Sequence, residues 1–231
     1  MPKQLTFELA AAPPASFSTF VAGPNAEVVD TLAALARGEL RETSLVLWGA
    51  PGAGKSHLLQ AAVAAAREIG RTAEWWAAPE AVPAATPPRG AIVAIDRVDE
   101  ADAASQARLF TLYNELAAAG GQLVVAASAP PARMTLRDDV RSRLGWGLVF
   151  ELRPLDDADK PSAVAAFARA RGFELSQDAI DYLLAHGRRD MATLVRTITA
   201  LDRESLAMKR AVTVPFIREW LQGELLPPKA G

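Results

Sequence analysis

The stretch GAPGAGKSH, from Gly49 to His57, constrains the fold more than any other part of the chain. The apolar run TSLVLWGA precedes it, and the Ala- and Leu-rich run KSHLLQAAVAAAREIG follows it. This order predicts a buried strand, a tight glycine turn and a helix that ends at Gly70. Glycines let backbone N–H groups curl around a phosphate, and the start of a helix favours negative charge. We therefore expect a phosphate-binding loop.

The spacing within this stretch assigns a role to each polar residue. Lys55 is expected to bridge the β- and γ-phosphates of a nucleotide, and the Ser56 hydroxyl to hold Mg²⁺. The alternative is a glycine-rich turn that binds no ligand, with His57 in an ordinary core or surface role. The residues expected to contact nucleotide here are Gly49, Gly52, Gly54, Lys55, Ser56 and His57.

Apolar runs elsewhere indicate the rest of the sheet. The runs at 91–96 (AIVAID) and 122–128 (QLVVAAS) are bounded by turn signals, as is typical of parallel strands covered on both faces. TAEWWAA predicts a further strand, whereas beyond Pro154 only amphipathic helical patterns follow. We expect an α/β P-loop domain with a five-stranded parallel sheet flanked by helices, followed by a small all-helical lid domain.

Three segments are expected along the chain. Residues 1–16 form a flexible tail that ends in clustered Pro and small residues, residues 17–154 the nucleotide-binding base domain, and residues 155–231 the helical lid. The lid helices are predicted over 158–172, 176–186, 190–206 and 214–223.

Asp96 ends the apolar run 91–96, so its carboxylate is expected at the carboxyl end of the sheet, where it would complete the Mg²⁺ site with Ser56. The alternative is an Asp that caps the next turn. Arg97 follows, where a hydrolytic site needs a carboxylate to orient water. Asp99 and Glu100 could substitute, or could cap the next helix. We therefore predict weak intrinsic hydrolysis, below about 1 s⁻¹.

Composition excludes several classes of function. With 25 basic and 27 acidic residues and a net charge of -2, the chain has no global charge for wrapping nucleic acid or lying on an anionic membrane. It has no cysteine, which excludes disulfides and thiolate metal sites. No uninterrupted apolar run reaches the roughly 18 residues that a membrane helix needs. These features favour a soluble cytoplasmic protein.

Several segments together resemble one family. GAPGAGKSHLL, AIDRVDE, RSRLGWGLVFELRPLDDADK, ARARGFELSQDAIDYLL and TVPFIREWL are similar to the Hda family of AAA+ proteins, the regulatory inactivators of the replication initiator DnaA. The similarity extends over essentially the whole chain, and SRLGWG and RGFEL are its most specific parts. The resemblance implies an AAA+ base and lid that bind ADP or ATP, dock on the DNA-loaded sliding clamp and trigger hydrolysis of DnaA-bound ATP.

By this resemblance, Arg143 matches the arginine finger, which one subunit projects into the nucleotide site of another to stabilise charge on the transferring phosphoryl group. The alternative is that Arg141 and Arg143 only bracket a short helix and pair with Asp138 or Asp139.

The resemblance also extends the nucleotide site. Arg189 matches the sensor II arginine of the lid, with Arg188 as the competing candidate and a solvated helix-end arginine as the alternative. Ser128 occupies the sensor I position. Phe20, Val21 and Asn25 lie in FSTFVAGPN, where AAA+ initiators enclose the adenine; anchoring of the tail is the alternative.

The segment QLTFEL in the tail resembles a clamp-binding peptide. Gln4 would fix its orientation, and Leu5, Phe7 and Leu9 would fill a groove on the clamp, the β subunit of DNA polymerase III. The Pro-rich segment that follows would act as a spacer. The partners are thus expected to be DnaA and the clamp, with DNA contacted only through the clamp.

Two other classes of function remain. One is a self-sufficient P-loop ATPase or small-molecule kinase, against which Arg97 argues. The other is a helicase-loader or initiator-like module that binds single-stranded DNA, although no basic helix-turn-helix domain follows the lid as it does in DnaA. A nucleotide-dependent homodimer is also expected, because AAA+ subunits commonly pair finger to nucleotide.

Overall fold

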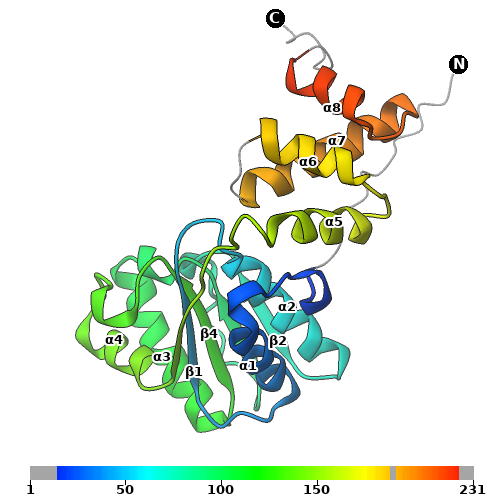
Figure 1. Cartoon of the computed structure of the whole chain (residues 1–231). Helices are drawn as coiled ribbons and strands as arrows, with labels where there is room; N and C mark the ends of the chain where they lie inside the picture. The colour runs from blue at the N-terminus through cyan, green and yellow to red at the C-terminus, as the bar shows by residue number, and fades with distance from the viewer. Residues whose placement is uncertain (1–14, 188–190, 224–231) are drawn as a thin grey trace, which may run out of the picture.

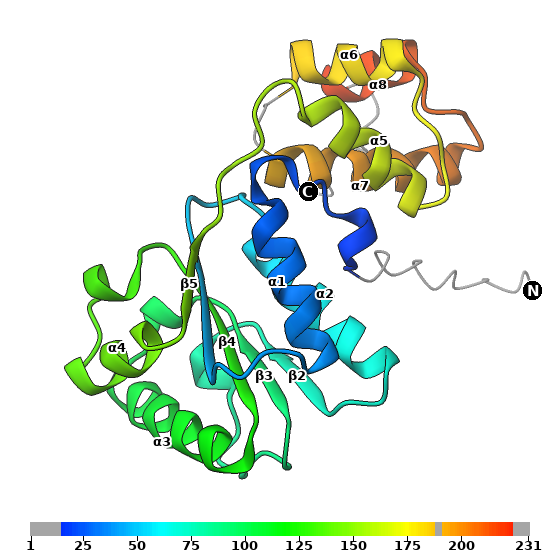
Figure 2. The same cartoon turned by 60° about the horizontal axis from the view of Figure 1, so that its bottom comes forward.

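The computed structural model describes residues 15–187 and 191–223 and contains two parts. A base built on a central sheet lies below a group of helices, and a single extended segment after the last strand connects them (Figure 1). The first helical turn, η1 (Phe17–Thr19), lies between these parts, next to α2 (Lys55–Glu68) of the base and α5 (Lys160–Ala170) of the upper helices (Figure 2).

The sheet has five parallel strands in the order β2-β3-β4-β1-β5. This confirms the expected α/β fold. The central strand β4 is buried at all six positions, as a parallel strand with both faces covered requires. The strands are β1 (Ser44–Trp48), β2 (Ala73–Trp76), β3 (Ile92–Ile95), β4 (Gln122–Ala127) and β5 (Leu148–Glu151).

Two pairs of helices cover the two faces of the sheet. Successive residues of a strand point to opposite faces, so Leu45 and Leu47 pack with α1 and α2, whereas Val46 packs with α3 and α4. The helices are α1 (Ala26–Arg37), α2 (Lys55–Glu68), α3 (Ala103–Ala119) and α4 (Asp138–Gly145).

The upper part is all-helical and has its own core. Val164, Leu183, Leu201 and Phe216 are fully buried, one from each of its four helices. These helices are α5 (Lys160–Ala170), α6 (Gln177–His186), α7 (Met191–Met208) and α8 (Val214–Leu221). They confirm the expected helical lid.

Candidate nucleotide site

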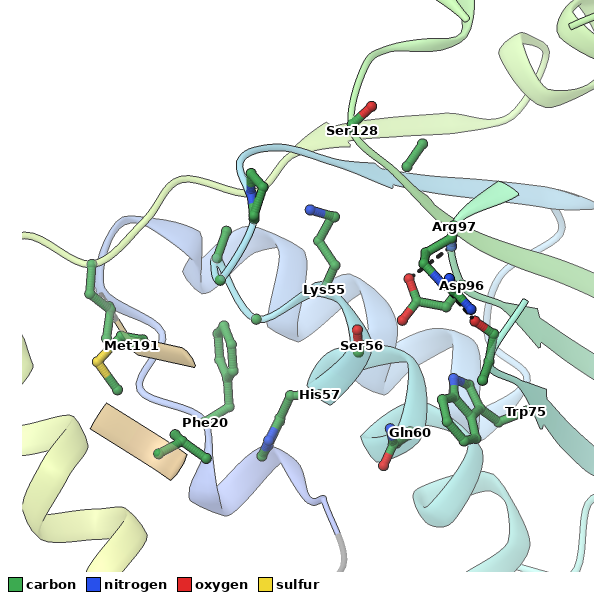
Figure 3. A pocket seen from close by; sticks show the side chains of 18 of the residues that line it. Phe20, Lys55, Ser56, His57, Gln60, Trp75, Asp96, Arg97, Ser128 and Met191 are labelled. Atoms are coloured by element: carbon green, nitrogen blue, oxygen red, sulfur yellow. Dashed lines mark hydrogen bonds between the residues drawn. The ribbon is translucent and has the colours of Figure 1, made fainter. Parts of the chain in front are cut away.

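A cavity of about 920 Å³ lies between the carboxyl edge of the sheet and the lid. Phe20 and Met191 lie at one end of it, Lys55 near its middle, and Asp96, Arg97 and Trp75 at the other end (Figure 3). Its lining includes Thr19, Phe20, Val21, Gly52, Gly54, Lys55, Ser56, His57, Asp96, Arg97, Asp99, Ser128, Leu155, Phe167, Met191 and Val195.

The glycine-rich turn has the backbone that a phosphate cradle needs. Gly49, Gly52 and Gly54 have φ angles of 151°, 80° and 99°, which favour glycine. A Cβ at Gly49 would lie only 2.4 Å from the carbonyl oxygen of Leu152, so the close approach of the turn to β5 also requires glycine. Helix α2 starts at Lys55, so its first N–H groups face the cavity lined by the turn.

The Lys55 ammonium lies inside this turn. Its Nζ donates hydrogen bonds to the carbonyl oxygens of Gly49 (2.7 Å) and Ala50 (3.0 Å). Burial lowers the pKa of Lys55, and the nearby carboxylates of Asp96 and Asp99 oppose that shift. Carbonyl oxygens of the turn thus hold the ammonium beside the first N–H groups of α2, and a cation together with such N–H groups can bind phosphate.

The residues expected at a magnesium ion are compatible with one. Asp96 is 8% exposed, and its Oδ1 accepts a hydrogen bond from the Arg97 N–H at 2.9 Å, which fixes the carboxylate. Asp96 and the Ser56 hydroxyl both line the cavity. No group of three or more His, Cys, Asp or Glu side chains forms a metal cage among the described residues. Mg²⁺ would therefore need nucleotide phosphates as further ligands, as is usual for this ion.

The three charged residues that follow Asp96 in this turn have different hydrogen-bond partners. The Arg97 guanidinium donates to the Ala77 carbonyl oxygen (3.1 Å) and pairs with Glu100 (3.1 Å). Asp99 instead accepts hydrogen bonds from the backbone N–H (2.8 Å) and the hydroxyl of Ser128. Neither acid caps α3.

The cap of α3 is Asp102, whose carboxylate accepts a 2.8 Å hydrogen bond from the Ser105 N–H. This hydrogen bond lowers the pKa of Asp102. The stretch after Asp96 is thus a polar turn with a helix-capping acid, Asp102, while Asp99 and Glu100 line the cavity.

The other end of the cavity is apolar. A Cβ at Gly54 would lie 2.6 Å from the Phe20 ring, so this ring packs directly on the glycine turn. Val21, Leu155 and Val195 add aliphatic surface. A planar base fits such a lining, with the phosphates beside Lys55 in the middle of the cavity.

His57 ties the N-terminal segment to α2. Its Nε2 donates to the Ser16 carbonyl oxygen at 2.9 Å and lies 3.2 Å from the Thr19 hydroxyl. Burial lowers the pKa of His57, although the hydrogen bond to Ser16 opposes the shift. His57 lines the cavity, but its ring nitrogen is directed toward this segment.

Asn25 was expected at the base pocket, and the structure corrects this. It is 2% exposed and is not among the residues that line the cavity. Its amide donates to the Arg153 carbonyl oxygen (2.9 Å) and accepts from the Arg153 N–H (2.8 Å). Both ends of the side chain hold the segment that follows β5.

Arg143 lies on α4 and does not line the cavity. Its guanidinium lies 4.0 Å from the centre of the Phe110 ring, and its Nε donates to Asn114 at 3.1 Å. It forms no ion pair with a described carboxylate, whereas neighbouring Arg141 pairs with Asp138. The alternative, in which both arginines pair with Asp138 or Asp139, holds within the described chain for Arg141, whereas Arg143 donates to the backbone carbonyl oxygen of Asp139 at 3.3 Å.

Several expected residues lie outside the described residues. These are the sensor II candidates Arg188 and Arg189 and the clamp-binding residues Gln4, Leu5, Phe7 and Leu9. Conversely, sequence reasoning missed cavity residues that no motif marks, namely Gln60, Trp75, Leu155, Phe167, Met191 and Val195. For the residues in lid helices, the helical periodicity is the one sequence signal that could indicate a helix face turned toward the base.

The fold is the AAA+ fold. Domain III of the Thermotoga maritima initiator DnaA superimposes with a TM-score of 0.78 at 22% identity, over 92% of this chain and 97% of that one. AMPPCP-bound DnaA from Aquifex aeolicus gives 0.68 at 20% identity, over 94% and 71%. The Thermotoga maritima RuvB branch migration motor gives 0.68 at 18%, over 92% and 72%.

Two family models match the chain, one within the base and one within the lid. Residues 91–151 match the bacterial DnaA ATPase domain, and residues 157–221 match the Hda lid domain. The chain is an AAA+ protein that is similar to DnaA in its base and to Hda in its lid. No helix in the described part of the chain is long and apolar enough to cross a membrane.

Proposed function

We propose that this protein is a negative regulator of replication initiation that works on DnaA. It binds ADP or ATP with Mg²⁺ in the cavity, docks on the DNA-loaded sliding clamp, and supplies Arg143 to the nucleotide site of DnaA. DnaA-bound ATP is then hydrolysed. Similarity of the lid to Hda and of the base to DnaA supports this proposal.

The position of Arg143 is the observation that supports this proposed function most directly. An arginine that served this chain's own nucleotide would have to line the cavity, and Arg143 does not. Its guanidinium rests on the Phe110 ring, without a carboxylate partner among the described side chains, at the surface of α4. A pre-positioned cation of this kind can stabilise phosphoryl charge in a neighbouring subunit, an effect of about 10³–10⁵ in rate.

Nucleotide binding is supported by the cavity itself. The Lys55 ammonium lies within the glycine turn at the start of α2, and Ser56 and Asp96 can complete a magnesium site with phosphate oxygens. The apolar end around Phe20 suits a base. DnaA from Aquifex aeolicus, which has the same fold, was solved with AMPPCP.

The clamp interaction is proposed from the tail sequence, with Gln4, Leu5, Phe7 and Leu9 as the docking residues. The His57 ring holds the Ser16 carbonyl oxygen, so Ser16 lies beside α2 and the nucleotide cavity. A tail that starts beside the nucleotide cavity would tether the AAA+ body to the clamp. Contact with DNA would then come through the clamp, in keeping with the net charge of -2.

The test is hydrolysis of DnaA-bound ATP with and without DNA-loaded clamp. We expect the wild type to stimulate hydrolysis only with clamp, and Arg143→Ala and a Gln4/Leu5/Phe7 triple alanine to fail while remaining folded. Arg141→Ala is the matched control, because Arg141 lies on the same helix and forms an exposed ion pair with Asp138.

Two outcomes would contradict the proposal. Equal stimulation by Arg143→Ala and the wild type would show that Arg143 does not act as an arginine finger. Rapid ATP turnover without DnaA and clamp would make this protein a self-sufficient ATPase. Salt-dependent binding to single-stranded DNA in the absence of clamp would instead favour an initiator-like module.

A further inference from the structure

We propose that Trp146 anchors this protein to DnaA while Arg143 acts on the nucleotide of DnaA. The indole of Trp146 is buried in that complex and supplies affinity, whereas Arg143 supplies rate. This inference rests on the proposed function, and it names the surface of this chain through which that function works.

Trp146 carries the most exposed large apolar side chain of the described residues, at 72% exposed. Val149, three residues further on, is 39% exposed. It is in register with Val46 of β1, which packs with α3 and α4, so Val149 lies on the face of the sheet where α4 ends. The two side chains therefore border the same edge of the base, where α4 is followed by the edge strand β5 (Figure 2). An exposed indole beside further apolar surface is typical of a protein-binding site.

The backbone around Trp146 is fixed against β1. The Trp146 N–H donates to the Ser142 carbonyl oxygen at 3.0 Å, and the Ser44 hydroxyl donates to the Arg143 carbonyl oxygen at 3.0 Å. A Cβ at Gly147 would lie only 1.9 Å from the Ser44 carbonyl oxygen, so the chain passes directly against the start of β1. A backbone held in this way presents the indole with little further loss of entropy on binding.

Trp146 also lies beside the proposed arginine finger. The centre of its indole is 5.8 Å from the guanidinium carbon of Arg143. A partner that admits Arg143 to its nucleotide therefore also covers Trp146. Arginine and tryptophan are the residues that most often supply the binding energy at the centre of an interface.

Charge complementarity favours DnaA as the occupant of this surface. The Arg143 guanidinium donates to the Asn114 side chain and to the Asp139 carbonyl oxygen, both of which are neutral acceptors. Its positive charge is thus available to the phosphates of DnaA-bound ATP. An apolar anchor next to such a cation fits a partner whose nucleotide lies at its own surface, with an apolar recess beside it.

An anchor can be distinguished from a residue that only orients the finger. Trp146 is one of three aromatic residues with a ring within 6.0 Å of the Arg143 guanidinium carbon. Loss of a side chain that only orients Arg143 would lower the maximal rate of hydrolysis. Loss of an anchor instead raises the concentration of this protein at which DnaA is half-saturated, because it removes binding that is equal in the ground state and the transition state.

The test is single-turnover hydrolysis of labelled ATP on DnaA with DNA-loaded clamp, at increasing concentrations of the full chain. We expect Trp146→Ala to raise the half-saturating concentration at least about tenfold and to leave the maximal rate unchanged. Trp146→Phe should lie between the two, since it keeps an apolar ring. Arg143→Ala should instead lower the maximal rate. Ile69→Ala is the matched control: Ile69 is 57% exposed at the end of α2 far from the glycine turn, and its loss should change neither quantity.

Three outcomes would overturn the inference. A wild-type half-saturating concentration for Trp146→Ala would show that DnaA does not bury the indole. A lower maximal rate at an unchanged half-saturating concentration would show that Trp146 only orients Arg143. If sedimentation showed that Trp146→Ala dissociates a wild-type homodimer while the DnaA titration is unchanged, the surface would belong to a second copy of this chain. A wild type that stimulates no hydrolysis at any concentration would overturn the proposed function as well.

Discussion

The Arg143 guanidinium of α4 lies 4.0 Å from the centre of the Phe110 ring of α3. Asn114, one helical turn further along α3, accepts a 3.1 Å hydrogen bond from its Nε, and the rings of Tyr113 and Trp146 lie within 6.0 Å. The orientation of the Arg143 guanidinium is therefore set by aromatic ring faces and by the side-chain amide of Asn114. Such a contact holds the charge in place without neutralising it.

We predict that Phe110→Leu lowers stimulation of DnaA-bound ATP hydrolysis by roughly fivefold, because loss of a cation–π contact of about 1 kcal/mol frees the guanidinium. Leucine keeps an apolar side chain at this position, so thermal unfolding should change little. Initial rates with DNA-loaded clamp measure the effect. An unchanged rate, in an assay where Arg143→Ala is inactive, would show that the ring does not position the finger.

Asn25 gives a prediction about stability. Asn25→Ala removes the two hydrogen bonds that this buried side chain makes with the Arg153 backbone, so we expect the free energy of unfolding to fall by about 1–3 kcal/mol. Urea denaturation measures this. Asn114→Ala is the control, because Asn114 is exposed and bonds only to a side chain. Equal stability of both variants would contradict a structural role for Asn25.

The sheet and lid could be predicted because their signals are local. The run 122–127 is apolar at nearly every position, and all six of its residues are buried in β4. Position 49 requires glycine, because its φ angle is 151° and a Cβ there would lie 2.4 Å from the Leu152 carbonyl oxygen. The alternation of strand and helix then allows few topologies.

The roles of the polar residues could not be predicted in the same way, because they depend on contacts between distant segments. Asn25 and Arg153 are 128 residues apart, and Asp99 and Ser128 are 29 apart. The sequence pattern predicts that Asn25 lies beside the adenine base, and it does not distinguish a helix-capping role of Asp99 from a catalytic one. Only the packing of η4 (Val98–Glu100) against the end of β4 brings Asp99 to Ser128.

The glycine turn gives a second stability prediction. Gly49→Ala places a Cβ 2.4 Å from the Leu152 carbonyl oxygen, and neither backbone can move without disturbing β1 or β5. We expect a loss of about 2–4 kcal/mol in the free energy of unfolding and loss of nucleotide binding. Gly70→Ala is the control: its φ is +80°, but a Cβ there meets nothing within 4 Å. It should cost only about 1 kcal/mol.

His57 makes stability depend on pH through the N-terminal segment. Burial lowers the pKa of the folded-state imidazole below its ordinary value of about 6.5, so the neutral ring is favoured in the folded protein. The unfolded chain then binds more protons at pH values just below about 6.5. The contribution of His57 to stability is thus complete above this pH and is lost as pH falls toward the folded-state pKa.

We predict that wild-type stability falls more steeply than that of His57→Gln between about pH 7.5 and pH 5.5, by at most about 1.4 kcal/mol per pH unit. Glutamine does not titrate and can still donate to the Ser16 carbonyl oxygen, so the two proteins differ mainly in the protonation of residue 57. Urea unfolding at a series of pH values measures both slopes. Parallel curves would mean that His57 protonates equally in the folded and unfolded chains, and that burial beside Ser16 and Thr19 has no energetic consequence.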